Sequence, residues 1–218
     1  MSTDNVTGAF ERIRAWLHGH APVSYEGLQP GASDADISAA ENQLGFALPA
    51  DLRALLRLTN GVAAETAYIE ENEDEGDVAN THFLGNQALL SLDQIVDRHT
   101  WLTSAGGIDR GYLPWLTHEP KGMTSCTLVS ARPEDSGRLA KWDEYEGLHF
   151  QSGAQTIAEL LVAHADALES GTGVLMGSSS GDVPGIIWGC LVWDDPDHPS
   201  LMVPEAWAPV HPARGHRS

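Results

Sequence analysis

The stretch ISAAENQLGFALPADLRALLRLTNG, residues 37–61, has the pattern of two short helices joined by a glycine and a proline. Ser33 can cap the first helix, because Asp36 follows three residues later in an approximate capping box. Gly45 is suited to end that helix, since glycine adopts the left-handed conformation after a helix at little cost. Pro49 stands where the second helix should begin, at a position that needs no amide donor. The pattern therefore predicts a pair of helices with buried leucines.

The residues that shape this helix pair also resemble the signature of the SUKH superfamily, which contains the yeast cell-wall-assembly regulator and many bacterial immunity proteins. The matching pattern is Glu41-x-x-Leu44-Gly45-x-x-Leu48-Pro49-x-Asp51-Leu52, followed by Leu55-Leu56 and Asn60-Gly61. Weaker similarities occur at residues 89–95, 112–115 and 156–161, so the resemblance covers roughly residues 10–171. Residues 124–128 lack the aspartate that members often carry in that strand, so no role tied to that acid is transferred to this chain.

The order of the predicted elements favours the α+β class. Helical spacing at residues 10–17 precedes the helix pair, and capping boxes at Ser91 and Thr156 predict two more helices. An aromatic turn is predicted at residues 112–115. Short strands are predicted at residues 83–84, 89–90, 124–130, 139–142 and 148–151. Because most of these strands are joined by short turns, we expect a mostly antiparallel sheet with helices packed on one side, a SUKH-like arrangement.

The chain is predicted to have two parts. Residues 1–171 form the SUKH-like domain in this interpretation. Residues 172–218 hold a Gly/Ser-rich loop, an apolar run and a proline-rich tail, which we expect to pack on the same domain. The apolar run at residues 186–193 would promote aggregation if it were exposed. We therefore expect it to return to the sheet as one buried strand.

A strong excess of acidic residues is the second informative feature. The 218 residues include 31 acids and 12 lysines and arginines, which gives a formal net charge of −19. Such a surface repels phosphate backbones, so we expect no nucleic-acid binding. It would instead steer a basic protein partner. The alternative is that the acidity serves solubility alone, and the composition leaves both explanations open.

Two acidic segments are candidate surfaces for binding such a partner. One lies within residues 65–77 and the other within residues 142–147. Exposed members among Tyr68, Trp142 and Tyr145 could anchor a partner. The candidate contacts, chosen from charge clustering alone, are Glu70, Glu71, Glu73, Asp74, Glu75, Asp77, Asp143, Glu144 and Glu146.

Candidate nucleophiles lack the sequence context that their chemistry needs. Gly177-x-Ser179-x-Gly181 matches the nucleophile-elbow pattern, but the Asp-Val-Pro-Gly that follows cannot open the required helix. Cys126 lies in an apolar strand pattern, where a free cysteine is usually a small core residue. A linker and a core residue are therefore the better interpretations.

Acid–base and metal motifs are equally weak. His18 and His20 lack further ligands at metal-binding spacing. The paired acids, Glu70 with Glu73 and Asp143 with Glu146, lie among other acids, without the apolar pocket that acid–base chemistry needs. We therefore expect no catalytic, cofactor-binding or metal-binding residues, and no enzymatic activity.

Membrane and secretion signals are also missing from the sequence as given. No run approaches the ~18 apolar residues of a membrane helix, and the first residues do not have the pattern of a signal peptide. We therefore expect a cytoplasmic protein that does not bind membranes, with Cys126 and Cys190 as reduced thiols.

Three functions are compatible with these observations to different degrees. The SUKH resemblance implies an immunity-type protein that neutralises a cognate toxin by direct binding, and the acidic charge of the chain would suit a basic toxin. The alternative is an intracellular regulatory adaptor of the cell-wall-assembly-regulator type. The two differ in affinity, because an immunity protein binds one partner tightly and an adaptor binds several weakly. A hydrolase using Ser179, or a thiol enzyme using Cys126, is a distant third hypothesis.

Overall fold

A computed structural model describes residues 3–63, 66–67, 78–79, 82–118, 124–150, 153–174, 181–200 and 204–210. The helices are α1 (Thr3–His20), α2 (Pro22–Glu26), α3 (Asp34–Leu44), α4 (Ala50–Leu58), α5 (Leu92–Ser104), α6 (Ile157–Ser170) and the short 3-10 helix η1 (Pro204–Ala206). The strands are β1 (Thr66–Ala67), β2 (Val78–Ala79), β3 (Ala88–Leu89), β4 (Tyr112–Thr117), β5 (Ser125–Ser130), β6 (Leu139–Asp143), β7 (Gly147–His149), β8 (Val183–Ile187), β9 (Cys190–Asp194) and β10 (Ala208–Pro209).

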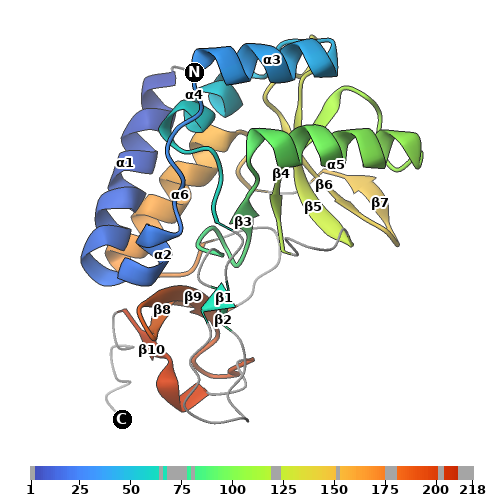
Figure 1. Cartoon of the computed structure of the whole chain (residues 1–218). Helices are drawn as coiled ribbons and strands as arrows, with labels where there is room; N and C mark the ends of the chain where they lie inside the picture. Colours follow the sequence, from blue (N-terminus) through green and yellow to red (C-terminus); the bar gives the residue numbers. More distant parts are fainter. Residues whose placement is uncertain are drawn as a thin grey trace.

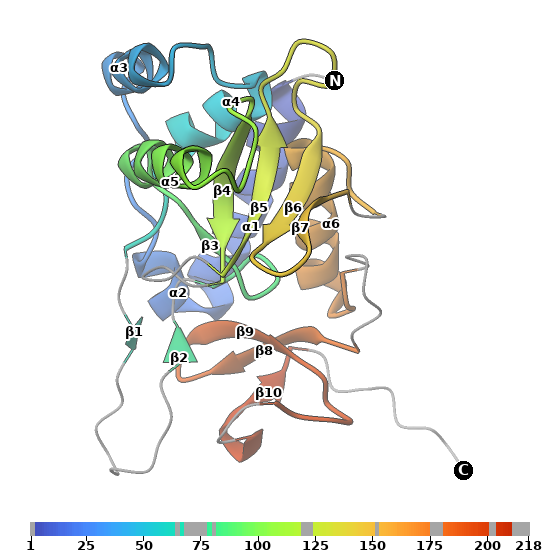
Figure 2. The ribbon, with the colours of Figure 1, turned by 90° about the vertical axis from the view of Figure 1, so that its right-hand side faces the viewer.

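The strands form a main sheet and two smaller ones (Figure 1). The main sheet has five antiparallel strands in the order β3-β4-β5-β6-β7. A three-stranded sheet has the order β10-β8-β9, and β1 pairs with β2. Viewed from the side, the three-stranded sheet lies below the main sheet (Figure 2). The predicted α+β class with a mostly antiparallel sheet is confirmed.

Helices cover both faces of the main sheet. Neighbouring residues of a strand point to opposite faces. Val129 and Leu139, which are paired across β5 and β6, belong to the large apolar cluster that contains α1, α4 and α6. Leu128 and Ala140, the next pair, belong to a second cluster with Leu102 of α5. The helices are therefore divided between two layers, where the sequence had suggested a single side.

The helix pair forms as its sequence predicts. Ser33 caps α3 in a capping box with Asp36, and Gly45 follows α3 in the left-handed conformation with φ +84°. Pro49 stands one position earlier than expected, as the residue that caps α4. The carboxylate of Glu41 accepts a hydrogen bond of 2.8 Å from the Leu48 amide and pairs with Arg53 of α4. Glu41, the acidic residue of the signature, thus joins α3 to α4.

Asn60 and Gly61 connect this pair to the sheet. The Asn60 side chain accepts a hydrogen bond of 2.9 Å from the Leu92 amide at the start of α5. Gly61 has φ +78°, and its backbone lies directly against that of Leu90 and Ser91. These signature residues build the fold, because each one fixes where two elements meet.

Two local predictions are wrong, and α2 was not predicted. Residues 83–84 form a turn and not a strand. Residues 112–115 belong to the buried strand β4 and not to an aromatic turn. The physical reason is that β4 lies inside the sheet, where every one of its side chains is covered.

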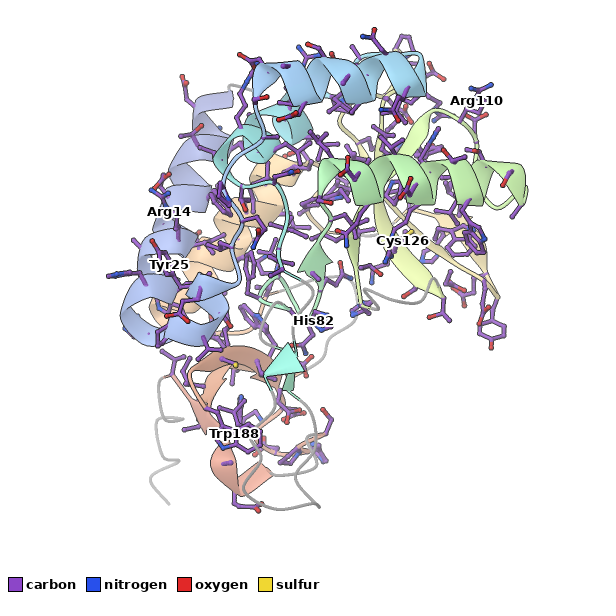
Figure 3. All side chains as sticks on the ribbon, in the orientation of Figure 1. Arg14, Tyr25, His82, Arg110, Cys126 and Trp188 are labelled. Atoms are coloured by element: carbon purple, nitrogen blue, oxygen red, sulfur yellow. The ribbon has the colours of Figure 1, made fainter. Side chains whose placement is uncertain are left out.

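The apolar run at residues 186–193 does not return to the main sheet as one strand. It is interrupted by a tight turn at Trp188 and Gly189, with φ +50° and +79°, which makes it the hairpin β8–β9 of the separate sheet. Two consecutive positive φ values are typical of the turns that close two-residue hairpins. Trp188 lies in the turn of this C-terminal hairpin (Figure 3).

The separate sheet is attached to the main domain through polar contacts and core residues. The Asn86 side chain donates to the Trp193 carbonyl at 2.7 Å and accepts from the Trp193 amide at 3.0 Å. The Trp193 indole donates to the Phe83 carbonyl at 3.0 Å. Leu191 and Trp193 are buried in the large apolar cluster. The hairpin therefore completes the core from outside the main sheet.

Replacing Gly61 with alanine is expected to lower the free energy of unfolding by at least about 2 kcal/mol, because the new Cβ meets fixed backbone in a left-handed conformation. That Cβ would lie 2.5 Å from the Ser91 amide nitrogen. Urea denaturation measures the loss. The matched control is Gly8→Ala on α1, where a Cβ meets nothing within 4 Å; it should be neutral or stabilising. Equal effects of the two substitutions would contradict the steric argument.

Stability should fall in mild acid because of His164, which is fully buried in α6. Its Nδ1–H donates to the Leu160 carbonyl at 2.8 Å, and burial lowers the pKa of the imidazole to about 4. The unfolded chain has an ordinary pKa near 6.5, so unfolding takes up a proton between these values. The loss should approach about 1.4 kcal/mol per pH unit below pH 6.5.

Urea denaturation across pH 7 to pH 4.5 tests this expectation. His164→Leu should flatten the dependence, whereas His198→Gln, a change at an exposed histidine, should not. His82 contributes in the same direction, because burial also lowers its pKa to about 4. The difference between the two variants isolates the part due to His164, and identical slopes would refute it.

Candidate partner-binding site

One face of the main sheet changes from apolar to polar along its strands. Val129 and Leu139 lie on this face in the core, and residues two positions away share it. Thr127 pairs with Lys141, and Lys141 pairs with His149 on β7. The strand register therefore places these polar side chains in one row beyond the apolar core.

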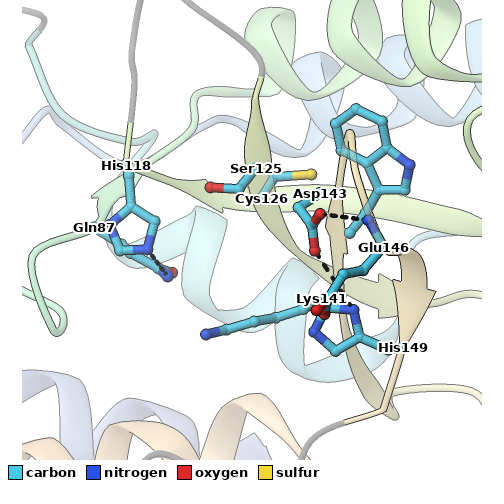
Figure 4. A pocket seen from close by; sticks show the side chains of 9 residues that line it. Gln87, His118, Ser125, Cys126, Lys141, Asp143, Glu146 and His149 are labelled. Atoms are coloured by element: carbon cyan, nitrogen blue, oxygen red, sulfur yellow. Dashed lines mark hydrogen bonds and ion pairs between the residues drawn. The ribbon is translucent and has the colours of Figure 1, made fainter. Parts of the chain in front are cut away.

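A cavity of about 200 Å³ opens at this polar end of the sheet. Strands β5, β6 and β7 contribute most of its lining, and the segment before β3 and the end of β4 complete it (Figure 4). The lining residues are Gln87, His118, Ser125, Cys126, Lys141, Trp142, Asp143, Glu146 and His149.

A chain of hydrogen bonds fixes one side of the cavity. The buried Thr127 hydroxyl donates to the Gln87 side-chain oxygen at 2.9 Å, and the Gln87 amide lies 2.8 Å from Nε2 of His118. Because an amide NH₂ can only donate, Nε2 must accept, and the ring proton sits on Nδ1. Nδ1 is 3.0 Å from the Asn86 carbonyl, which accepts that proton. These two contacts orient the His118 ring, with Nε2 toward Gln87 and Nδ1 toward Asn86.

The β6–β7 hairpin fixes the other side. One oxygen of Asp143 accepts hydrogen bonds from the amides of Tyr145 at 2.9 Å and Glu146 at 2.7 Å. These bonds, led by that of Glu146, lower the pKa of Asp143, so the carboxylate stays ionised. Its second oxygen lies 3.7 Å from Nδ1 of His149. Gly147 closes the turn with φ +72°.

The Cys126 thiol of the cavity is not activated for nucleophilic chemistry. Burial raises the pKa of the Cys126 thiol to about 12, so the thiol is protonated at neutral pH. Cys126 lies in the sheet beside α5 (Figure 3). Burial lowers the pKa of Lys141, while the neighbouring Asp143 opposes that change. The arrangement displays charge and hydrogen-bonding groups on a rigid hairpin.

The acids predicted for this hairpin lie together as expected from their spacing. Asp143, Glu144 and Glu146 occupy one turn, around a Tyr145 side chain that is 90% exposed. Trp142 is buried in the cluster with α5, so it is no surface anchor. The other candidates lie outside the described residues: Tyr68, Ser179 and the acids Glu70, Glu71, Glu73, Asp74, Glu75 and Asp77.

The remaining histidines of the sequence analysis lie elsewhere, and some site residues were missed. His18 packs edge-on against Tyr25, and His20 stacks on Trp16. Lys141 and His149 were missed, although alternation with apolar neighbours in two predicted strands was a usable signal. Gln87 and His118 had no local signal, because only the tertiary fold brings them to β5.

Asp143 should stabilise the β6–β7 turn through the side-chain oxygen that accepts two amide hydrogen bonds. Asp143→Ala leaves two turn amides without their acceptor and is expected to lower the free energy of unfolding by about 1 kcal/mol. Asp143→Asn keeps an acceptor in the same place and should cost less than half of that. Urea denaturation of both variants provides the measurement. If the two variants lose the same stability, charge and not hydrogen bonding holds the turn.

Comparisons with known proteins agree with the structure. Among the described residues, no helix has the length and apolar character needed to cross a membrane. A search of curated proteins finds no match for the chain. The model of the SMI1 / KNR4 family (SUKH-1) matches residues 31–203, which include the helix pair, the main sheet, α6 and the β8–β9 hairpin. The resemblance to SUKH proteins is thereby confirmed, and the chain belongs to the SMI1 / KNR4 family (SUKH-1).

Proposed function

We propose that this protein is a non-enzymatic binding module, of the immunity type, which neutralises a cognate basic toxin by direct association in the cytoplasm. The observation that carries the proposal is the rigid β6–β7 hairpin, which presents Asp143, Glu144 and Glu146 around an exposed Tyr145. The net charge of −19 and membership of the SMI1 / KNR4 family (SUKH-1) support it.

The physical basis is electrostatic attraction followed by local contact. A protein of this charge accelerates its encounter with a basic partner, most strongly at low salt. Affinity then depends on a few well-placed anchors within an interface of roughly 1,600 Å². Tyr145 has the properties of such an anchor, since it offers a large ring and a hydroxyl at low entropic cost. The fixed turn means that little order has to be gained on binding.

A regulatory adaptor is the alternative within the same family, and it would use the same surface. The number and affinity of the partners separate the two. We expect affinity capture with the full chain from its native cytoplasm to yield one basic polypeptide that stays bound through extensive washing. Several weakly held proteins of mixed charge would favour the adaptor and contradict the immunity proposal.

Association with the captured partner should depend steeply on salt. Raising the salt from about 0.01 M to about 0.15 M shortens the Debye length to about 8 Å, and the association rate should fall at least about tenfold. Surface plasmon resonance or stopped-flow fluorescence gives this rate. An association rate that does not change with salt would remove electrostatic steering from the proposal.

Two hairpin substitutions should weaken binding without changing stability. Glu144→Gln removes one exposed charge and Tyr145→Ala removes the exposed ring, and neither side chain is buried. We expect the dissociation constant to rise at least about tenfold for Tyr145→Ala, in the range of interface hot spots, with the melting temperature nearly unchanged. The matched control is Glu26→Gln, an equal charge change at an exposed position of α2. An effect of the control equal to that of Glu144→Gln would mean that only the net charge matters.

A further inference from the structure

The β6–β7 hairpin brings three metal-ligating side chains to one point. Asp143, Glu146 and His149 each offer one ligand atom, and these atoms all lie within 4.8 Å of one another (Figure 4). Among the described residues, no other group of three or more histidines, cysteines or acids has this property. The three come from two strands and their turn, so the hairpin register alone sets their distance.

The ligand atoms, up to 4.8 Å apart, have to move closer together to hold an ion. Ligand atoms at about 2.1 Å from a tetrahedral ion are about 3.4 Å apart. The Glu146 side chain is exposed, so it can rotate to supply the remaining closure. Two turn amides hold one oxygen of Asp143. Its second oxygen lies 3.7 Å from Nδ1 of His149, and a bound ion would replace the 3.3 Å contact of that nitrogen with the Gly147 carbonyl.

The donor set selects the class of cation. Ca²⁺ and Mg²⁺ prefer cages of oxygen ligands. A set of two carboxylates and one imidazole suits Zn²⁺ and related first-row ions. Three protein ligands leave at least one coordination position for water or for a donor from another molecule. The adjacent cavity of about 200 Å³ has room for that fourth ligand.

We propose that Asp143, Glu146 and His149 form a binding site for a divalent first-row transition-metal ion, of the Zn²⁺ class, with an open position toward the cavity. This inference goes beyond the proposed function and does not depend on a partner. Lys141 opposes it, because it lies opposite His149 in the β6–β7 register and its ammonium interacts with Asp143. The Lys141 ammonium repels a bound metal ion, so removing its charge should tighten metal binding.

Titration of the full-length protein with ZnCl₂ by isothermal calorimetry tests the site, with Co²⁺ absorption as the spectroscopic readout. His149→Ala and Glu146→Gln should each weaken binding at least about tenfold, by analogy with the effects known for metal-site substitutions. Lys141→Gln should tighten binding, because it removes the opposing charge. Glu144→Gln is the matched control, since it removes an equal charge from the same turn without touching the triad.

The pattern of four variants decides the outcome. Failure of the wild-type protein to bind either ion would overturn the proposal. So would weakening by Glu144→Gln as large as that by Glu146→Gln, since this would indicate diffuse attraction to the acidic surface. Circular dichroism and thermal melting show whether His149→Ala remains folded; if it does not, Glu146→Gln and Lys141→Gln carry the test in opposite directions. The capture experiment does not depend on these titrations, so either proposal can be refuted without refuting the other.

Discussion

The close approach of Gly61 to the backbone of Leu90 and Ser91 is the packing constraint on which the junction of the helix pair with the sheet depends. No other residue type fits there, because a Cβ would meet main-chain atoms and φ is positive. Around it, the Asn60 side chain caps α5, the Gly61 carbonyl accepts from the Gln29 amide, and the Val62 amide donates to Leu89. One corner of the chain thereby fixes the helix pair, α5 and β3 relative to each other.

The candidate site follows from that arrangement. The corner sets the position of β3, and the segment just before β3 carries Gln87 and Asn86. Gln87 reaches Thr127 and His118 on one side, while Asn86 pairs with the backbone of Trp193 on the other. A single segment of the main domain therefore forms one wall of the cavity and also the attachment point of the C-terminal sheet. The attachment of the C-terminal sheet and the wall of the cavity thus depend on two neighbouring residues, Asn86 and Gln87.

The acidic hairpin is the part of the molecule best suited to meet another one. It lies at the edge of the main sheet, its turn is held by two amide bonds to Asp143, and its tyrosine is 90% exposed. Rigid display of charge favours fast and specific association, because little conformational entropy is lost. A metal ion on Asp143, Glu146 and His149 would change the charge of the same hairpin, which connects the two proposals physically.

The sequence by itself determined the features that depend on neighbours along the chain. Capping at Ser33 and Ser91, the left-handed Gly45 after α3, the acidic hairpin turn and the family signature were all readable, because each uses contacts within a few residues. Only the tertiary structure decided that β4 is a buried strand inside the sheet, that the hairpin ending at Trp193 lies outside the main sheet, and that Gln87 joins Thr127 to His118. Those outcomes depend on contacts between residues far apart in the chain, and local periodicity carries no information about such contacts.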